Sequence, residues 1–320
     1  MRKLVIELFA RHFDNAYLRS LSDAAMLTLT GQRIAFTTDS YVVKPLEFPG
    51  GDIGKLAVCG TVNDLAVMGT RPLYVSAGFI LEEGLRLDLL ERMVESMAKE
   101  ARSAGVEIVT GDTKVVPHGD CDQLFINTSG IGSHPLGYGL STEPIEPGDA
   151  IVVSGTFGEH GIAVLGARSE LTFETEIKSD CASLNKMIET VLSDCHGVKW
   201  MRDATRGGVA AVLSEFVEGM PFGALIQESN IPVRRDVQAV CELLGFDPLH
   251  LANEGKVVLV SKANDAGRIV ALLRQHPLGG NAAQIGSVSA EGSGYVRLQT
   301  ISGGIRRLQR PTGELLPRIC

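Results

Sequence analysis

Aspartates recur beside apolar segments in the first half of the chain. Asp39, Asp64 and Asp112 lie after predicted strands or beside turns, and Asp23 stands before the first alternating run. Carboxylate oxygens brought together by loops suit Mg²⁺, which usually binds one or two carboxylates and nucleotide phosphate oxygens. Each aspartate alone is more often a turn or cap residue. Their repetition predicts one Mg²⁺ site formed by Asp23, Asp39, Asp64 and Asp112.

Two lysines lie close in sequence to these acids. Lys55 and Lys114 can neutralise phosphate charge, or they can form exposed ion pairs. The glycines of residues 155–161 can cradle phosphate at a helix N-terminus or allow close helix–strand packing. That segment matches neither the dinucleotide fingerprint nor the P-loop, so we draw no nucleotide site from it alone.

Two turns in the second half carry acidic groups. Asp203 and Thr205 precede Gly207-Gly208, where a side chain can cap a helix and the backbone can approach a ligand closely. Glu254 stands in the short turn Asn253-Glu254-Gly255 before an apolar run. It can act as a base or as a structural partner. The histidines show no metal-binding spacing, so zinc is not expected.

Cys320 is the last residue of the sequence. Gly303-Gly304 offers a hinge before it, and the tail beyond can extend on the order of 50 Å at ~3.3–3.6 Å per residue. A carrier thiol on a mobile arm is one interpretation, and an incidental cysteine on a frayed end is the other. Prenylation is excluded because its signal needs three residues after the cysteine.

Hydrophobic patterning predicts the elements that position these residues. In the first half we expect a helix within residues 1–22, strands over 26–30, 34–38, 73–81, 106–110 and 123–133, and helices over 53–68 and 90–104. Asp52 is the predicted N-cap of the second helix. Residues 111–114 read as a polar turn after a buried strand. Strand–helix alternation continues to about residue 299, which indicates mixed sheets with helices packed on one side.

Proline and glycine in residues 143–149 mark a domain boundary. We therefore expect an N-terminal domain over residues 1–142, a C-terminal α/β domain over 149–302, and a flexible tail over 303–320. The net charge of −8 argues against non-specific nucleic-acid binding. No apolar run is long enough for a membrane span, and six cysteines without a CxxC pair indicate a reduced, cytoplasmic protein.

Seven stretches, taken together, resemble the hydrogenase-maturation carbamoyl dehydratases, the HypE family. They occur in family order at residues 38–43, 48–55, 63–64, 111–116, 202–209, 253–256 and 317–320. The terminal Pro-Arg-Ile-Cys is the most specific of them. Family members usually begin with a glycine-rich stretch before the first helix, whereas this sequence starts there with Met1-Arg2-Lys3. If that stretch covers the nucleotide, we expect altered ATP affinity.

The resemblance implies the two-domain α/β (α+β) fold of the aminoimidazole-ribonucleotide synthetase (PurM-like) superfamily. In that fold two N-terminal domains pair into a dimeric β-barrel, ATP lies near their interface, and a C-terminal α/β sandwich follows. It also implies a homodimer, the carbamoyltransferase HypF as donor, and the HypC–HypD iron scaffold complex as cyanide acceptor. The implied reaction converts a carbamoyl group on Cys320 to a thiocyanate with ATP and Mg²⁺.

The residues that we expect to take part divide into two groups. Cys320, Glu254 and Lys114 are the catalytic candidates, with Glu254 as base. The cofactor-binding candidates are Asp39, Lys55, Asn63, Asp64, Asp112, Thr113, Asp203 and Thr205. Two alternatives stay open: a selenophosphate synthetase-like kinase of a free small molecule, and a noncatalytic thiol carrier or scaffold.

Overall fold

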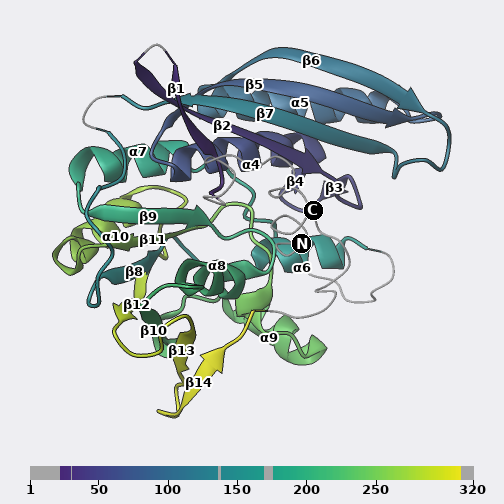
Figure 1. Ribbon diagram of the computed structural model, residues 1–320. Coiled ribbons are helices and arrows are strands. Elements are labelled where there is room, and N and C mark those ends of the chain that lie inside the picture. Colours follow the sequence, from purple (N-terminus) through teal and green to yellow (C-terminus); the bar gives the residue numbers. More distant parts are fainter. Residues whose placement is uncertain (1–21, 30, 136–137, 169–175, 311–320) are drawn as a thin grey trace.

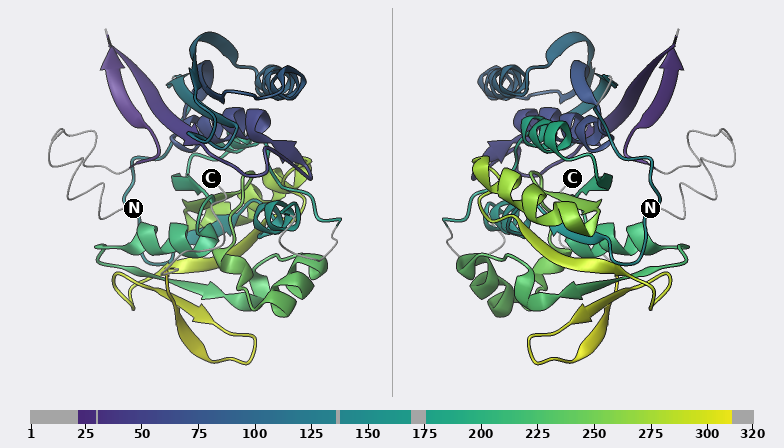
Figure 2. Two further views of the ribbon diagram at one scale, coloured as in Figure 1. Left: turned by 90° about the vertical axis from the view of Figure 1, so that its right-hand side faces the viewer. Right: turned by 90° about the vertical axis from the view of Figure 1, so that its left-hand side faces the viewer.

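The computed structural model describes residues 22–29, 31–135, 138–168 and 176–310, so the helix expected within residues 1–22 and the terminal Cys320 lie outside the described residues. The described chain forms two α/β units in separate layers (Figures 1 and 2). No helix among the described residues has the length and apolarity that crossing a membrane requires.

The N-terminal unit contains an open five-stranded sheet. Its strand order is β1 (Ala25–Leu29), β2 (Gln32–Tyr41), β7 (Leu124–Ser133), β5 (Arg71–Glu82) and β6 (Glu107–Val116). Only β5 and β6 run parallel; the other pairs are antiparallel. The short strands β3 (Glu47–Phe48) and β4 (Gly51–Asp52) form a separate ribbon. Within the described single chain the sheet does not close into a barrel.

Two helices cover the inner face of this sheet. Helix α5 (Leu87–Ala104) is amphipathic and buries Met93, Met97 and Ala101. Helix α4 (Ile53–Val67) begins at Asp52, whose side chain accepts a hydrogen bond from the Lys55 amide at 2.9 Å, so the predicted N-cap is confirmed. Apolar and small residues cover α4 on all sides, as expected for a helix buried all round. It packs against both the sheet and elements of the C-terminal unit.

The predicted turn over residues 111–114 is wrong, because β6 continues through it. Strand β6 pairs with β5 in parallel register from Tyr74↔Glu107 to Glu82↔Val116. A Cβ atom at Gly111 would lie 2.2 Å from the Ala77 carbonyl oxygen, so this glycine allows close strand approach and does not mark a turn. Asp112, Thr113 and Lys114 are therefore exposed along an edge strand.

The C-terminal unit is built on a seven-stranded mixed sheet. Its strand order is β14 (Ile305–Leu308), β13 (Val296–Gln299), β10 (Gly223–Gln227), β12 (Ala283–Ser289), β8 (Ala150–Val153), β11 (Val257–Ser261) and β9 (Val198–Asp203). The helices are α6 (Glu159–Gly166), α7 (Asn185–Asp194), α8 (Gly208–Val217), α9 (Arg235–Leu244) and α10 (Ala266–Gln275). Short 3₁₀ turns occur at η2 (Glu228–Asn230), η3 (Pro248–His250) and η4 (Ala263–Asp265).

Helices cover both faces of this sheet, which corrects the expectation of packing on one side. Ile151 and Val153 of β8 belong to the core that includes α8, whereas Ala150 and Val152 belong to the core that includes α7 and α10. All four residues of β8 are buried. A strand buried along its whole length needs a layer on each face.

The C-terminal boundary also differs from the prediction. Gly303-Gly304 was expected to begin a flexible tail, but residues 300–304 form the turn between β13 and β14. Strand β14 pairs antiparallel with β13 from Val296↔Leu308 to Gln299↔Ile305. The sheet therefore extends beyond residue 302, to Leu308.

Candidate functional site

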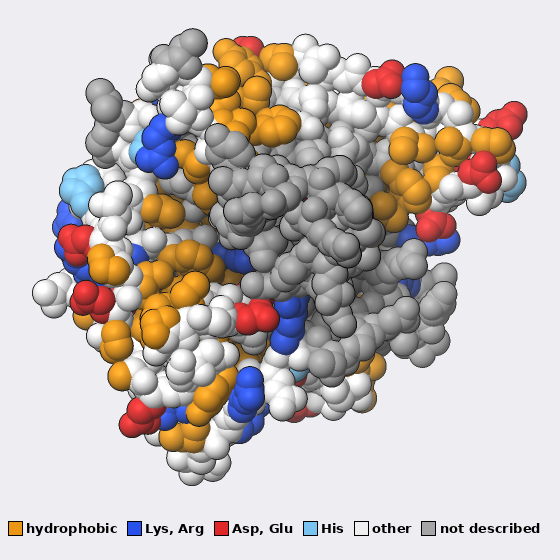
Figure 3. Space-filling view, viewed as in Figure 1, with side chains coloured by type: hydrophobic (Ala, Val, Ile, Leu, Met, Phe, Trp, Pro, Cys, Tyr) orange, Lys and Arg blue, Asp and Glu red, His pale blue; other side chains and the backbone are white. Residues whose placement is uncertain are grey.

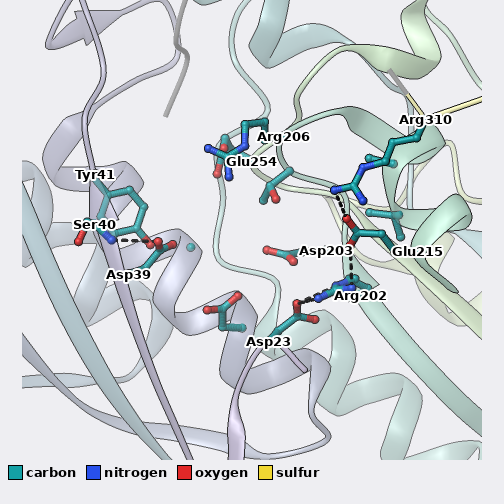
Figure 4. Close-up of a pocket in the computed structure, with 15 residues that line it drawn as sticks. Asp23, Asp39, Ser40, Tyr41, Arg202, Asp203, Arg206, Glu215, Glu254 and Arg310 are labelled. Carbon is teal, nitrogen blue, oxygen red and sulfur yellow. Dashed lines mark hydrogen bonds and ion pairs between the residues drawn. The ribbon is translucent and has the colours of Figure 1, made fainter. Parts of the chain in front are cut away.

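A cavity of about 280 Å³ lies where the two units meet (Figure 4). Helix α4 and strand β2 contribute from the N-terminal unit, while the end of β9 and helix α8 contribute from the C-terminal unit. The lining residues are Asp23, Asp39, Ser40, Tyr41, Gly60, Asp64, Arg202, Asp203, Thr205, Arg206, Ala211, Val212, Glu215, Glu254 and Arg310. Acidic and basic groups predominate among their side chains.

Three aspartates from distant segments converge in this cavity. Asp23 precedes β1, Asp64 belongs to α4, and Asp203 is the last residue of β9. One carboxylate oxygen from each lies within 4.8 Å of the others. Asp203 was expected to bind cofactor, but its place in this cluster suits a metal ligand equally well. Strand β9 packs against α4, and that packing brings Asp203 to Asp64.

Burial shapes the electrostatics of the cluster. It raises the pKa of Asp203 to about 8, with the neighbouring Asp23 charge as a second cause. Burial also raises the pKa of Asp64 well above its ordinary value, and the Asp203 and Asp23 charges add to this. The pKa of Asp23 is raised by burial in spite of the opposing effect of Arg202. Crowded buried carboxylates of this kind fit a divalent cation, which would offset their repulsion.

Asp39 and Tyr41 form another wall of the cavity. An Asp39 carboxylate oxygen accepts a hydrogen bond from the Ser40 amide at 2.9 Å. Burial raises the pKa of Asp39, while hydrogen bonds from Tyr41 and Ser40 oppose that shift. Tyr41 is also buried, which raises its pKa well above the usual value, so its hydroxyl stays protonated. Asp39 thus faces the cavity from outside the three-aspartate cluster.

Basic residues that are not among the predicted site residues line the remaining wall. Arg202 bridges Asp23, at 2.7 Å from Nε to Oδ1, and Glu215, at 3.0 Å from Nη1 to Oε2. Arg310 pairs with the other Glu215 oxygen at 2.5 Å. Figure 4 shows this chain of ion pairs along one side and Arg206 beside Glu254. Arg202 and Arg206 lie close to Asp203 in the sequence, and this proximity could have indicated that they belong to the same site. No sequence pattern pointed to Glu215 or Arg310.

Glu254 and Thr205 also line the cavity. Glu254 is only 5% exposed although it precedes β11 in a loop. Its position places a carboxylate in the same cavity as the aspartate cluster. Five of the predicted cofactor or metal residues therefore share one site with the predicted base: Asp23, Asp39, Asp64, Asp203 and Thr205.

The structure places five other predicted residues elsewhere. Asn63 is buried, and its side chain donates to the Ala182 carbonyl and accepts from the Leu184 amide. Lys55 donates from Nζ to the Gly50 carbonyl at 3.1 Å. Neither lines the cavity, and neither do Asp112, Thr113 and Lys114.

Two of these residues on β6, Asp112 and Lys114, form an exposed ion pair with each other. The Lys114 ammonium lies 3.3 Å from an Asp112 oxygen, and the backbone amide of Thr113 and the charge of Lys114 lower the pKa of Asp112. Asp112 and Lys114 pair with Gly78 and Ile80 of β5, and they lie on the sheet face opposite the helices. Within one chain they are separate from the cavity.

Comparison with known proteins places this arrangement in context. Residues 21–134 match the family model for the AIR synthase related protein, N-terminal domain, and residues 146–299 match its C-terminal domain. The chain is 48% identical over 323 residues to the carbamoyl dehydratase HypE of Rhodobacter capsulatus, covering 100% of this chain and 95% of that protein.

Two solved structures are also similar throughout. A chain of a HypE–HypF complex superimposes with a TM-score of 0.90 at 49% identity, covering 96% of this chain and 99% of that one. HypE in complex with ATP superimposes with a TM-score of 0.85 at 49% identity, covering 100% and 96%. The likeness therefore covers both sheets.

Proposed function

The chain belongs to the HypE family of carbamoyl dehydratases, and from that premise we propose that it dehydrates a carbamoyl group carried on Cys320. ATP drives the reaction, and the product is a thiocyanate that supplies cyanide for the iron centre of [NiFe]-hydrogenase. The observation that supports the proposal most directly is the cavity that holds both the Asp23–Asp64–Asp203 cluster and Glu254.

The chemistry requires two kinds of residue. The carboxamide oxygen of the S-carbamoyl group is a poor leaving group, so it must first accept the γ-phosphoryl group of ATP. Phosphoryl transfer releases ADP and one amide proton, and loss of that oxygen as phosphate, with loss of the second amide proton, then forms the carbon–nitrogen triple bond. A site for this reaction must bind charged phosphates and supply a base next to the amide nitrogen.

The aspartate cluster fits the first requirement. Asp23, Asp64 and Asp203 would hold Mg²⁺, which when bound offsets negative charge on nucleotide phosphates. Asp39 and Thr205 would contact the bound Mg·ATP from neighbouring walls. Arg202 keeps Asp23 oriented through its ion pair and lowers the net negative charge at the cavity.

Glu254 is the residue that we assign as the base. It reaches the cavity from a loop of the C-terminal unit, on the side where Arg206 also lies (Figure 4). A carboxylate held there would accept a proton from the amide nitrogen as phosphate leaves. Cys320 is the residue that we propose to carry the reacting carbon, because a thiol sulfur forms the thioester-like bond that a carbamoyl carrier needs.

We also propose a homodimer formed through the N-terminal sheet. The sheet face opposite the helices exposes Phe36 (41%), Tyr74 (45%), Ile80 (39%) and Ile131 (38%). Figure 3 shows hydrophobic side chains gathered over this part of the molecule. Phe36, Ile131 and Tyr74 are cross-strand neighbours, and exposed apolar side chains grouped in this way mark an interaction site. Pairing two such sheets would form the dimeric barrel and would bring Asp112 and Lys114 into the interface, with Thr113 between them on the edge strand.

We also propose three protein partners, HypF, HypC and HypD, and a cytoplasmic location. HypF, which forms a complex with the similar HypE chain, would load the carbamoyl group on Cys320. The HypC–HypD scaffold complex would accept the cyanide. A carrier thiol must stay reduced, and the described cysteines are all free, so we place the protein in the cytoplasm.

A single-turnover experiment tests this function. The protein is loaded with carbamoyl on Cys320, ATP and Mg²⁺ are added, and the mass of the C-terminal peptide is followed. We expect the mass to fall by one water, and Glu254→Gln to slow that step roughly 10²–10⁴-fold because a positioned base is lost. Loading and ATP binding should survive, since Gln keeps the size of the side chain.

Cys320→Ala provides the control for the carrier. It should abolish loading and leave ATP binding near normal. Rapid ATP turnover by Cys320→Ala with a free small molecule would instead indicate a kinase of the selenophosphate synthetase type. If the loaded wild-type protein does not dehydrate its carbamoyl group, the protein is a noncatalytic thiol carrier or scaffold.

A further inference from the structure

The loop that carries Glu254 is attached on one side through Asn253. This side chain is fully buried and uses three hydrogen bonds. Its oxygen accepts from the Gly158 amide at 2.8 Å, and its nitrogen donates to the carbonyls of Ala204, at 2.9 Å, and Leu251, at 3.1 Å. The loop is thereby fixed to the residue that follows Asp203.

Asp180 holds the same loop from the opposite side. Its carboxylate accepts hydrogen bonds from the backbone amides of Glu254, at 3.1 Å, and Gly255, at 3.2 Å. The Lys256 ammonium lies 3.1 Å from the same carboxylate, and the Asp180 side chain is only 3% exposed. One buried carboxylate therefore contacts three consecutive residues, and the first of them is the proposed base.

Two backbone features show how closely the segments fit. The Ala182 amide donates to the Glu254 carbonyl at 3.2 Å. A Cβ atom on Gly255 would lie 1.9 Å from the Asp180 carbonyl oxygen, so only glycine allows this approach. The segment around Asp180 also contacts the N-terminal unit, because Asn63 hydrogen-bonds to Ala182 and Leu184.

We infer that Asp180 is a positioning residue for Glu254, an inference that rests on the proposed function. Asp180 is not among the residues that line the cavity, so it acts through the loop and not on the substrate. A catalytic group must be held within about 0.5 Å and 10–20° of its productive geometry. Two amide hydrogen bonds to one charged, buried acceptor supply that restraint, and Lys256 compensates the charge.

Asp180→Asn tests the inference. The amide side chain keeps one acceptor oxygen but presents a donor to the other backbone N–H and loses the charge that pairs with Lys256. We expect single-turnover dehydration of carbamoylated Cys320 to slow roughly 10–100-fold, the scale expected for a misplaced catalytic group. Carbamoyl loading and ATP affinity should stay near wild type.

Asp149→Asn is the matched control. Asp149 is also a buried aspartate that accepts from a backbone amide, that of Glu146 at 2.7 Å, and pairs with a buried lysine, Lys199 at 2.9 Å. It does not line the cavity. The control should lose stability in the same way as Asp180→Asn while its dehydration rate per folded molecule stays at the wild-type value.

The double variant Glu254→Gln/Asp180→Asn separates positioning from general damage. If Asp180 acts through Glu254, its substitution should add no further slowing once the base is gone. Gly255→Ala gives a second approach, because its added Cβ must displace the loop from Asp180, and we expect the same defect. If Asp180→Asn does not fold, Gly255→Ala still tests whether the contact with Asp180 positions Glu254.

Two outcomes overturn the positioning role of Asp180 alone. The first is a wild-type dehydration rate in folded Asp180→Asn or Gly255→Ala. The second is that Asp180→Asn slows dehydration as much in the Glu254→Gln background as it does in the wild type. In both, loaded wild-type protein still dehydrates Cys320, so the proposed function stands. Failure of wild-type dehydration itself would reject the proposed function, and the inference with it.

Discussion

At the scale of single residues, burial decides the chemistry of the acidic groups. The pKa of Asp203 is raised to about 8 and that of Asp64 well above its ordinary value, and carboxylate oxygens of these two residues and Asp23 lie within 4.8 Å of one another. Exposed aspartates such as Asp88, which pairs with Arg86, have lowered pKa values instead. The same type of side chain thus forms a surface ion pair in one place and a proposed cation ligand in the other.

Asp64→Asn and Asp203→Asn should each weaken Mg·ATP binding about 10–100-fold or more, because a neutral amide holds a hard cation poorly. Isothermal titration calorimetry with Mg·ATP measures this. Asp88→Asn, which removes an exposed carboxylate on α5, should bind as wild type does. Unchanged affinity in both cavity variants would remove Asp64 and Asp203 from the metal site.

His160 in α6 is a second residue whose burial has a measurable consequence. It is fully buried, contacts Ser179 Oγ through Nδ1 at 2.8 Å, and packs edge-on against Phe48. Burial lowers its pKa from 6.5 to about 4. The folded state therefore keeps the ring neutral over a pH range where the unfolded chain protonates it.

The contribution of His160 to the free energy of unfolding should accordingly decrease as the pH falls. Its contribution is fully present above about pH 6.5 and is lost between about pH 6.5 and 4, by up to about 3 kcal/mol. The stability advantage of wild type over His160→Gln should shrink across that range in urea titrations. A pH-independent gap would contradict this account, and exposed His196→Gln is the control.

At the scale of elements, α4 is the helix that joins the two units. Its apolar surface packs on the N-terminal sheet and on α7 and β9, and Asn63 fixes the segment before α7 through both of its side-chain polar atoms. The next residue, Asp64, faces the cavity. The helix therefore determines where one metal-ligand candidate stands relative to Asp203.

Asn63→Ala should lower the free energy of unfolding by roughly 1–3 kcal/mol for each buried group left unpaired, the Leu184 amide and the Ala182 carbonyl. Urea unfolding measures the loss. Asn127→Ala, which removes exposed hydrogen bonds to Asp39 and Ser40, should cost much less. If Asn63→Ala keeps its stability but loses ATP affinity, Asn63 binds cofactor directly, as the sequence suggested.

At the scale of the whole molecule, the described residues cover the N-terminal sheet with helices on one face only. Helices α4 and α5 cover the inner face, while the outer face exposes aromatic and branched side chains. The same face carries Asp112 and Lys114. A second copy placed there would bury this apolar surface and would give these charged residues a route to a cofactor site that they lack in one chain.

Phe36→Asp should therefore convert a dimer to a monomer in sedimentation velocity, because it places a charge in the proposed interface. Leu87→Asp, at an exposed apolar position on α5, should stay dimeric. Mg·ATP affinity should fall in the monomeric variant and in Asp112→Asn. A wild-type monomer would refute the dimer, and a dimer with unaltered affinity in Asp112→Asn would exclude that residue from the site.

Much of the local structure could be predicted from residues alone. Asp52 caps α4 and Gly105 ends α5 where expected, because caps and periodicity are signals within a few neighbouring residues. The motifs also carried the family resemblance and with it the fold. Asp23, Asp39 and Asp64 were predicted to share a site, and all three face the cavity.

Tertiary packing decided what those signals could not. The edge strand β6 extends through residues 111–114 because β5 offers it a full-length partner, and β14 forms because β13 does. Asp203 meets Asp64 only because β9 packs on α4, and Glu215 and Arg310 reach the cavity through contacts between distant segments. The local conformation of a residue depends largely on its neighbours along the chain. Its place in a site depends on which distant surfaces bury each other.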